Sequence, residues 1–170
     1  MSETLDLQTI KKDFPVTRKV IYMNNGAIAP TPLSTIKAVA DFMLKCAEAG
    51  PDAPQISEYS MSLLDEVRTR VAHLINCERG EVVLVQSTTE GINMVANGIS
   101  WQKGDTIVVR GGRHEHYANY LPWVSLSQRK GVHLRDLPID EDSGYFDMAD
   151  LDKSIKGARM VAMSHALYNT

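Results

Sequence analysis

Residues 82–91 read Val82-Val83-Leu84-Val85-Gln86-Ser87-Thr88-Thr89-Glu90-Gly91. The four consecutive apolar residues predict a short, fully buried strand over Val82–Val85. Serine and threonine are residue types that begin helices, and the apolar spacing that follows them predicts a helix over residues 88–99. A buried strand that leads directly into a helix is typical of α/β folds with a parallel sheet.

The same alternation of strands and helices continues on each side of this stretch. Further strands are predicted at residues 20–23, 106–109, 132–137 and 159–164. Helices are predicted at residues 33–47, 120–128 and 147–155, and in a long segment that follows a proline-containing loop at 51–56 and ends at Ile75. The predicted fold is therefore α/β, a mostly parallel sheet with helices on both faces, preceded by an N-terminal arm over residues 1–19.

Composition excludes several classes of protein. The chain has 170 residues, of which 44% are hydrophobic and 23% are charged, so it contains enough apolar surface to fold. A net charge of −3 gives no general attraction to nucleic acid or to acidic membranes, and neither is predicted as a partner. Two cysteines, Cys46 and Cys77, cannot build a disulfide framework, so the predicted location is cytoplasmic.

Ligands of parallel sheets bind at the carboxyl ends of the strands, and the first such loop contains Ser87, Thr88 and Thr89. The free backbone N–H groups of a helix N-terminus attract anions, and the threonine hydroxyls could add donors to a phosphate. Plain helix capping is the alternative interpretation. The segment is neither a G-x-G-x-x-G fingerprint nor a Walker loop, so nucleotide binding by those routes is not supported.

The second loop contains His114 and His116, which lie two residues apart and would share one face of an extended segment. A metal site is conceivable, but the H-E-x-x-H pattern is absent. His116 could also stack on an aromatic ligand or act in acid–base chemistry, and a solvated polar loop is the remaining alternative. The third loop, residues 164–170, is a polar cluster that could equally be an ordinary exit from a strand.

These loops, in this order, resemble segments of the class V pyridoxal-phosphate enzymes, in particular the cysteine desulfurases and selenocysteine lyases. Val85–Ala96 is similar to their phosphate-binding loop and helix. Glu115–Trp123 resembles their Glu-His-His-Ala-Asn-x-x-Pro-Trp segment, and Tyr22–Ala27 resembles their Tyr-Leu-Asp/Asn-x-Ala-Ala segment. Ser164–Asn169 lies where the family has Ser/Thr-His-Val-Ser-Asn, and the resemblance extends over residues 14–170.

The resemblance implies the fold of the pyridoxal-phosphate-dependent, aspartate aminotransferase-like large domain, present here only in part over residues 20–170. It implies pyridoxal 5′-phosphate as cofactor, with its phosphate held at the start of a helix and a histidine stacked on its ring. The implied cofactor-binding residues are Thr88, Thr89, His116, His165, Tyr168 and Asn169, with His116 also the implied catalytic residue. The implied substrate-side residues are Asn24, Asn25, Gly26 and Ala27.

The implied activity is that of a cysteine desulfurase, usually a homodimer. L-cysteine would be converted to L-alanine, with the sulfur held as an enzyme persulfide for iron–sulfur cluster assembly or another sulfur-acceptor protein. The family's Schiff-base lysine follows a histidine, and none of the lysines of this chain does. The remaining strands, that lysine, the persulfide cysteine and the C-terminal domain are therefore expected outside these 170 residues, and the chain alone is expected to be inactive.

Two other interpretations stay open at this point. Another class V activity, such as an isopenicillin N epimerase-like enzyme or a lyase, would use the same loops. Alternatively, the chain is a non-catalytic half-domain that pairs with a second, complementary C-terminal chain carrying the missing lysine.

Overall fold

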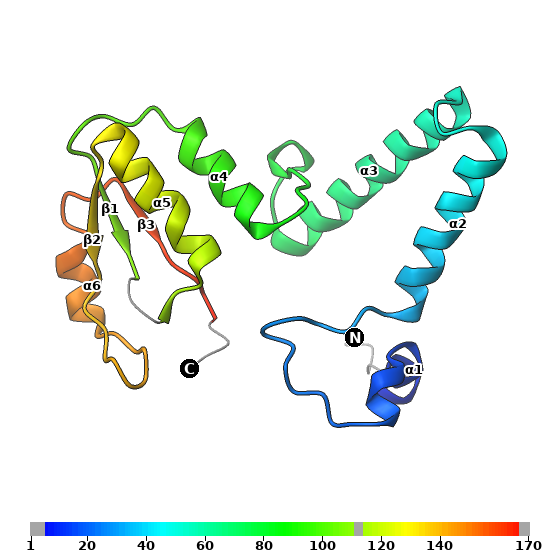
Figure 1. Ribbon diagram of the computed structural model, residues 1–170, viewed down its shortest axis with the longest axis horizontal. Helices are drawn as coiled ribbons and strands as arrows, with labels where there is room; N and C mark the ends of the chain where they lie inside the picture. Colours follow the sequence, from blue (N-terminus) through cyan, green and yellow to red (C-terminus); the bar gives the residue numbers. More distant parts are fainter. Residues whose placement is uncertain (1–5, 111–113, 167–170) are drawn as a thin grey trace. The chain divides into compact units, whose positions relative to one another are not determined.

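The computed structural model describes residues 6–110 and 114–166, and these fall into two compact units that are divided between Leu84 and Val85 (Figure 1). The predicted boundary between an arm over residues 1–19 and a domain over residues 20–170 stays a prediction. None of the helices in the described ranges is long and apolar enough to cross a membrane.

The first unit is helical. Its elements are α1 (Leu7–Asp13), the 3-10 helix η1 (Pro15–Arg18), α2 (Leu33–Ala49), α3 (Pro54–Ile75) and the 3-10 helix η2 (Arg79–Glu81). The Asp6 carboxylate caps α1 by accepting from the Gln8 backbone N–H at 3.0 Å. Asp13 joins α1 to α2, since it accepts from the Ser34 backbone N–H at 2.8 Å.

The long helices of the first unit begin and end for local reasons. α2 ends at Ala49, and the next residue, Gly50, has a φ of 90° that is open to glycine but costly for other residues. α3 begins at Pro54, where the missing proline N–H is harmless and the fixed φ suits the first helical position. The predicted loop at 51–56 is therefore too long by three residues. α3 ends at Ile75, and the next residue, Asn76, adopts the left-handed conformation with φ 56°.

The second unit is an α/β layer structure. Its elements are α4 (Thr88–Gly98), β1 (Thr106–Val109), α5 (Tyr117–Lys130), β2 (His133–Asp136), α6 (Met148–Ser154) and β3 (Met160–Ala162). The strands are parallel in the order β2-β1-β3, with Val108 opposite Arg135 on one side and Val161 on the other. Three of the predicted strands are thereby confirmed. α5 begins at Tyr117 rather than residue 120, with Pro122 in its first turns.

Helices cover both faces of this sheet, as predicted. Ile107 and Val109 lie on one face of β1 in a core with Trp123 and Leu126 of α5. Val108 points to the opposite face, because side chains alternate along a strand, and it is also completely buried. On that face the Arg135 guanidinium donates to the Ser154 carbonyl at the end of α6 at 2.6 Å, which places α6 there.

Two predicted strands are wrong. Residues 20–23 and 82–85 have no strand partner within the described part of the chain, although Val82 is buried. A strand exists through its hydrogen-bonded neighbour, so an apolar run without one stays irregular. Val83 is accordingly 60% exposed and Ile21 91% exposed. Apolar composition identified segments suited to pairing, but pairing depends on residues elsewhere.

The ion pair between Asp105 and Arg159 connects the starts of β1 and β3. The lowered pKa of Asp105 makes the free energy of unfolding depend on pH. The pKa of Asp105 is lowered, first by the hydrogen bond from the Gln102 backbone N–H and then by Arg159, whose Nη1 lies 2.6 Å from the carboxylate. A lowered folded-state pKa stabilises the protein above the unfolded-state pKa of about 4, and this contribution is lost as the pH falls below it.

We therefore expect the free energy of unfolding to drop between pH 7 and pH 3, and Asp105→Asn to make that drop smaller. Urea denaturation followed at the two pH values measures the difference. Equal pH dependence in the variant and the parent would contradict the role given to Asp105.

Candidate functional site

The N-terminus of α4 is capped by the Ser87 side chain. The Ser87 hydroxyl accepts from the Glu90 backbone N–H at 3.2 Å, and Glu90 in turn accepts from the Gln86 N–H at 2.7 Å. These bonds fix the turn that leads into the helix. Thr88 and Thr89 occupy the first two helical positions and are exposed. The N–H groups of such positions lack acceptors within the helix and point toward the region where an anion would bind.

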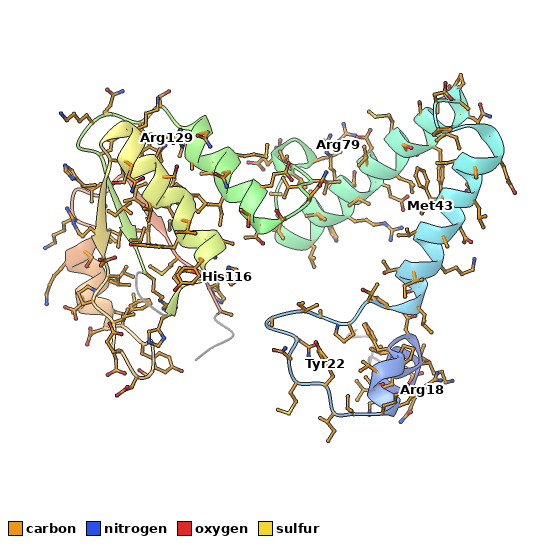
Figure 2. All side chains as sticks on the ribbon, viewed as in Figure 1. Arg18, Tyr22, Met43, Arg79, His116 and Arg129 are labelled. Carbon is orange, nitrogen blue, oxygen red and sulfur yellow. The ribbon has the colours of Figure 1, made fainter. Side chains whose placement is uncertain are left out.

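His116 begins α5 in a defined orientation. It is the N-cap residue, and its ring Nδ1 accepts from the Ala118 backbone N–H at 3.1 Å. A ring nitrogen that accepts is unprotonated, so the other nitrogen, Nε2, carries the proton in the neutral ring. His116 is exposed, and Figure 2 shows it at the opposite end of α5 from Arg129. The helix cap therefore holds an imidazole in place at the surface.

A buried carboxylate joins the start of α5 to the end of β3. Glu115 is only 6% exposed, and its Oε1 accepts from the His116 N–H at 2.9 Å and from the Ser164 hydroxyl at 2.6 Å. Its Oε2 accepts from the Ser164 N–H at 2.8 Å. The Asn119 amide nitrogen donates to the Ser164 hydroxyl at 2.5 Å and approaches Glu115 Oε1 at 3.3 Å. His165 follows Ser164 directly and is exposed.

α4 and α5 pack side by side in the same direction, so their N-termini lie at one end of the unit (Figure 1). At their C-terminal ends, the Arg129 guanidinium donates to the Asn97 side-chain oxygen at 3.1 Å. Near their first turns, Gly91 of α4 and Asn119 of α5 line one cavity of about 350 Å³, which β3 and the residue after it, Met163, complete. The cavity therefore lies between α4, α5 and the end of β3, in the same part of the unit as the two helix N-termini.

One further titratable group belongs to this end of the unit. Partial burial raises the pKa of the Tyr120 phenol, and the nearby Asp136 carboxylate raises it further. Tyr120 is therefore a neutral hydrogen-bonding group across the physiological pH range.

Of the predicted site residues, Thr88, Thr89, His116 and His165 all lie in the second unit at the ends of helices and strands just described. Tyr168 and Asn169 lie outside the described residues. Asn24, Asn25, Gly26 and Ala27 form an exposed turn in the first unit, in which the Asn24 carbonyl accepts from the Ala27 N–H at 3.2 Å.

The two neighbouring histidines have different surroundings. His114 is buried, and its Nε2 lies 2.7 Å from the Glu141 carbonyl oxygen, whereas His116 is exposed at the helix cap. No group of three or more metal-binding side chains occurs within residues 6–110 and 114–166.

The residues that sequence reasoning missed are Glu115, Asn119 and Ser164. All three stood in the segments singled out from the sequence, but none was given a role. The available signal was topological, because parallel neighbouring strands bring the loops that follow them to the same edge.

Comparison with known proteins identifies the family. The aminotransferase class-V family model matches residues 21–169. The chain belongs to the class-V aminotransferase family. A probable cysteine desulfurase of Pyrococcus abyssi is 37% identical, in a match that covers 93% of this chain and 39% of that protein. A cysteine desulfurase of Dickeya dadantii is 34% identical, in a match that covers 95% of this chain and 42% of that protein.

Solved structures agree with the class-V assignment. A cysteine desulfurase from Thermococcus onnurineus, solved in its apo form, is 31% identical, has a TM-score of 0.78, and matches 95% of this chain and 40% of its own. A C-DES variant with glycine covalently linked to the pyridoxal-phosphate cofactor has a TM-score of 0.84 at 23% identity, a likeness of fold. This class-V chain spans about two fifths of the length of the relatives it matches, so its fold is part of a larger domain.

Pyridoxal 5′-phosphate is the cofactor of this family, and the described residues fit it. The phosphate needs anion-binding N–H groups, which the first turn of α4 provides at Thr88 and Thr89. The flat pyridine ring needs a flat partner held in one plane, and the Ala118 N–H bond holds the His116 imidazole in that way. The two features lie at the same end of the same helical layer.

Proposed function

We propose that this chain is the cofactor-binding N-terminal part of a pyridoxal-phosphate-dependent cysteine desulfurase. The whole enzyme would convert L-cysteine to L-alanine and hold the sulfur as a persulfide for iron–sulfur cluster assembly or another sulfur acceptor. The observation that carries the proposal is that the α4 N-terminus and the His116 cap lie at the same end of two helices packed side by side. The relatives named cysteine desulfurase support the choice of substrate.

Each proposed residue has one task. Thr88 and Thr89 donate to the cofactor phosphate through backbone N–H and hydroxyl groups. His116 lies over the pyridine ring and is oriented by the Ala118 N–H. His165, Tyr168 and Asn169 contribute to the cofactor pocket, and Asn24, Asn25, Gly26 and Ala27 approach the substrate. When bound, the cofactor supplies an electron sink for the α-carbon of the amino-acid substrate.

The partners follow from what these 170 residues lack. None of the lysines follows a histidine, as the family's cofactor-binding lysine does. We propose that this lysine and the sulfur-accepting cysteine are provided by further residues of a longer chain or by a complementary C-terminal chain, in a homodimeric enzyme. The free thiols of Cys46 and Cys77 support the proposed cytoplasmic location.

Cofactor binding tests the proposal directly. We expect the chain to bind pyridoxal phosphate in equilibrium dialysis, and His116→Ala to weaken that binding roughly two- to tenfold through loss of ring stacking. His133→Ala is the matched control, because His133 is exposed at the start of β2, at the other end of the sheet. Absence of binding by the parent chain, or equal weakening by the two variants, would contradict the proposed site.

Activity tests the need for a partner. We expect these 170 residues with cysteine and pyridoxal phosphate to release alanine no faster than the free cofactor does, because the chain lacks the lysine of the family motif. Alanine release above that rate would show that the chain is a catalyst without a partner.

A further inference from the structure

Glu115 lies between two segments that each carry a proposed cofactor residue. His116 follows it at the start of α5, and Ser164 and His165 follow β3, a strand distant in sequence. The Glu115 side chain is buried and bonded to the backbone N–H groups of His116 and of Ser164, at 2.9 and 2.8 Å. One side chain thus connects the two histidine-bearing segments through their main chains, where it sets the position of each.

The neighbours of Glu115 require two acceptor oxygens. Its Oε1 receives the His116 N–H, the Ser164 hydroxyl and the Asn119 amide, and its Oε2 receives the Ser164 N–H. An ionised carboxylate offers acceptors only, so it matches this set of donors. A glutamine at this position would turn its NH₂ group toward a donor whichever way the amide points. An aspartate would be one methylene too short to reach.

We infer that Glu115 is a positioning residue of the cofactor site, which holds the His116 and Ser164–His165 segments at a fixed separation. The inference rests on the proposed function for what the two segments hold, whereas the coupling between them rests on the hydrogen bonds alone. Glu115 itself is buried beneath the segments, and it acts through the main chain of its neighbours. In the proposed enzyme, Glu115 thereby sets how the segments that contact the cofactor are placed.

The test compares Glu115→Gln with Asp105→Asn in the full 170-residue chain without cofactor. Asp105 is the matched control, because it joins β1 and β3 through Arg159 at the opposite end of these strands. Amide hydrogen exchange is measured by NMR at His116 and Ser164. We expect Glu115→Gln to accelerate exchange at both amides by about tenfold or more, as for a lost bond to a charged acceptor, and Asp105→Asn to leave both unchanged relative to the rest of the unit.

A second variant keeps the test decisive if Glu115→Gln does not fold. Ser164→Ala retains the Ser164 N–H bond but loses the hydroxyl that links Glu115 to Asn119. We expect it to accelerate exchange at the His116 amide severalfold, although His116 belongs to a different segment. Unchanged exchange at His116 in Ser164→Ala, or equal acceleration by Asp105→Asn, overturns the inference.

Cofactor affinity separates this inference from the proposed function. We expect Glu115→Gln to weaken pyridoxal-phosphate binding by about tenfold and Asp105→Asn to leave it unchanged. Accelerated exchange with unaltered affinity in Glu115→Gln would overturn the positioning role while the proposed function stands. A parent chain that binds no pyridoxal phosphate, with exchange still coupled through Glu115, would instead refute the proposed function and retain the connection between the segments.

Discussion

Leu126→Ala is expected to lower the free energy of unfolding of the second unit by about 2–5 kcal/mol. Leu126 is completely buried and packs in the core with Ile107, Val109 and Trp123, where removing its side chain leaves a cavity between α5 and the sheet. The loss is a large part of the roughly 5–15 kcal/mol that stabilises an ordinary domain. Urea denaturation followed by tryptophan fluorescence measures it, since Trp101 and Trp123 lie edge to face in this core.

Leu121→Ala provides the control for this prediction. It makes the same chemical change on the same helix, but Leu121 is 54% exposed. Its substitution is expected to cost less than about 1 kcal/mol, because little packing is lost. Equal losses for the two variants would show that α5 does not pack on the sheet through Leu126.

Replacing the threonines at the start of α4 is expected to have the largest effect on cofactor binding. Thr88→Val combined with Thr89→Val removes two hydroxyl donors and keeps the shape of the side chains. Loss of two hydrogen bonds to a charged phosphate is expected to weaken pyridoxal-phosphate binding by about 100-fold or more. Equilibrium dialysis of the variant against the parent chain measures the change.

Thr106→Val is the control for the threonine pair. Thr106 begins β1 at the opposite end of the sheet, where its carbonyl accepts from the Arg159 N–H at 2.8 Å. Its substitution is expected to leave cofactor affinity unchanged. If the double variant bound the cofactor as tightly as the parent, the threonines would only occupy the first turn of a helix that Ser87 caps, which is plain capping, the alternative that the sequence left open.

The part of the candidate site at the start of α4 could be located from the sequence, because its residues are neighbours along the chain. Ser87, Thr88 and Thr89 occur between an apolar run and a helical pattern, and the structure has them at the N-terminus of α4. His116 was also singled out, but its orientation was not, because that depends on the Ala118 N–H to which Nδ1 is bonded. The bond between Glu115 and Ser164 joins residues far apart in sequence, and no periodicity encodes it.

The elements that could be located from the sequence are those whose signals come from neighbouring residues. Helix spacing, caps and breakers placed α2, α4 and α6 and three strands of a parallel sheet, since each of these signals acts within a few residues. The order of motifs along the chain was sufficient to indicate the class V family, which the match over residues 21–169 confirms.

Pairing between segments far apart in the sequence decided which apolar runs became strands and which polar residues became buried. Residues 82–85 and 107–109 are alike in apolar character, yet residues 107–109 lie in a strand and residues 82–85 do not. The difference is that β1 has a hydrogen-bonded neighbour on each side, which no property of the segment itself supplies. The same holds for the buried Glu115, because a carboxylate leaves water only where donors from other segments meet it. Only the folded chain brings these donors to the carboxylate of Glu115.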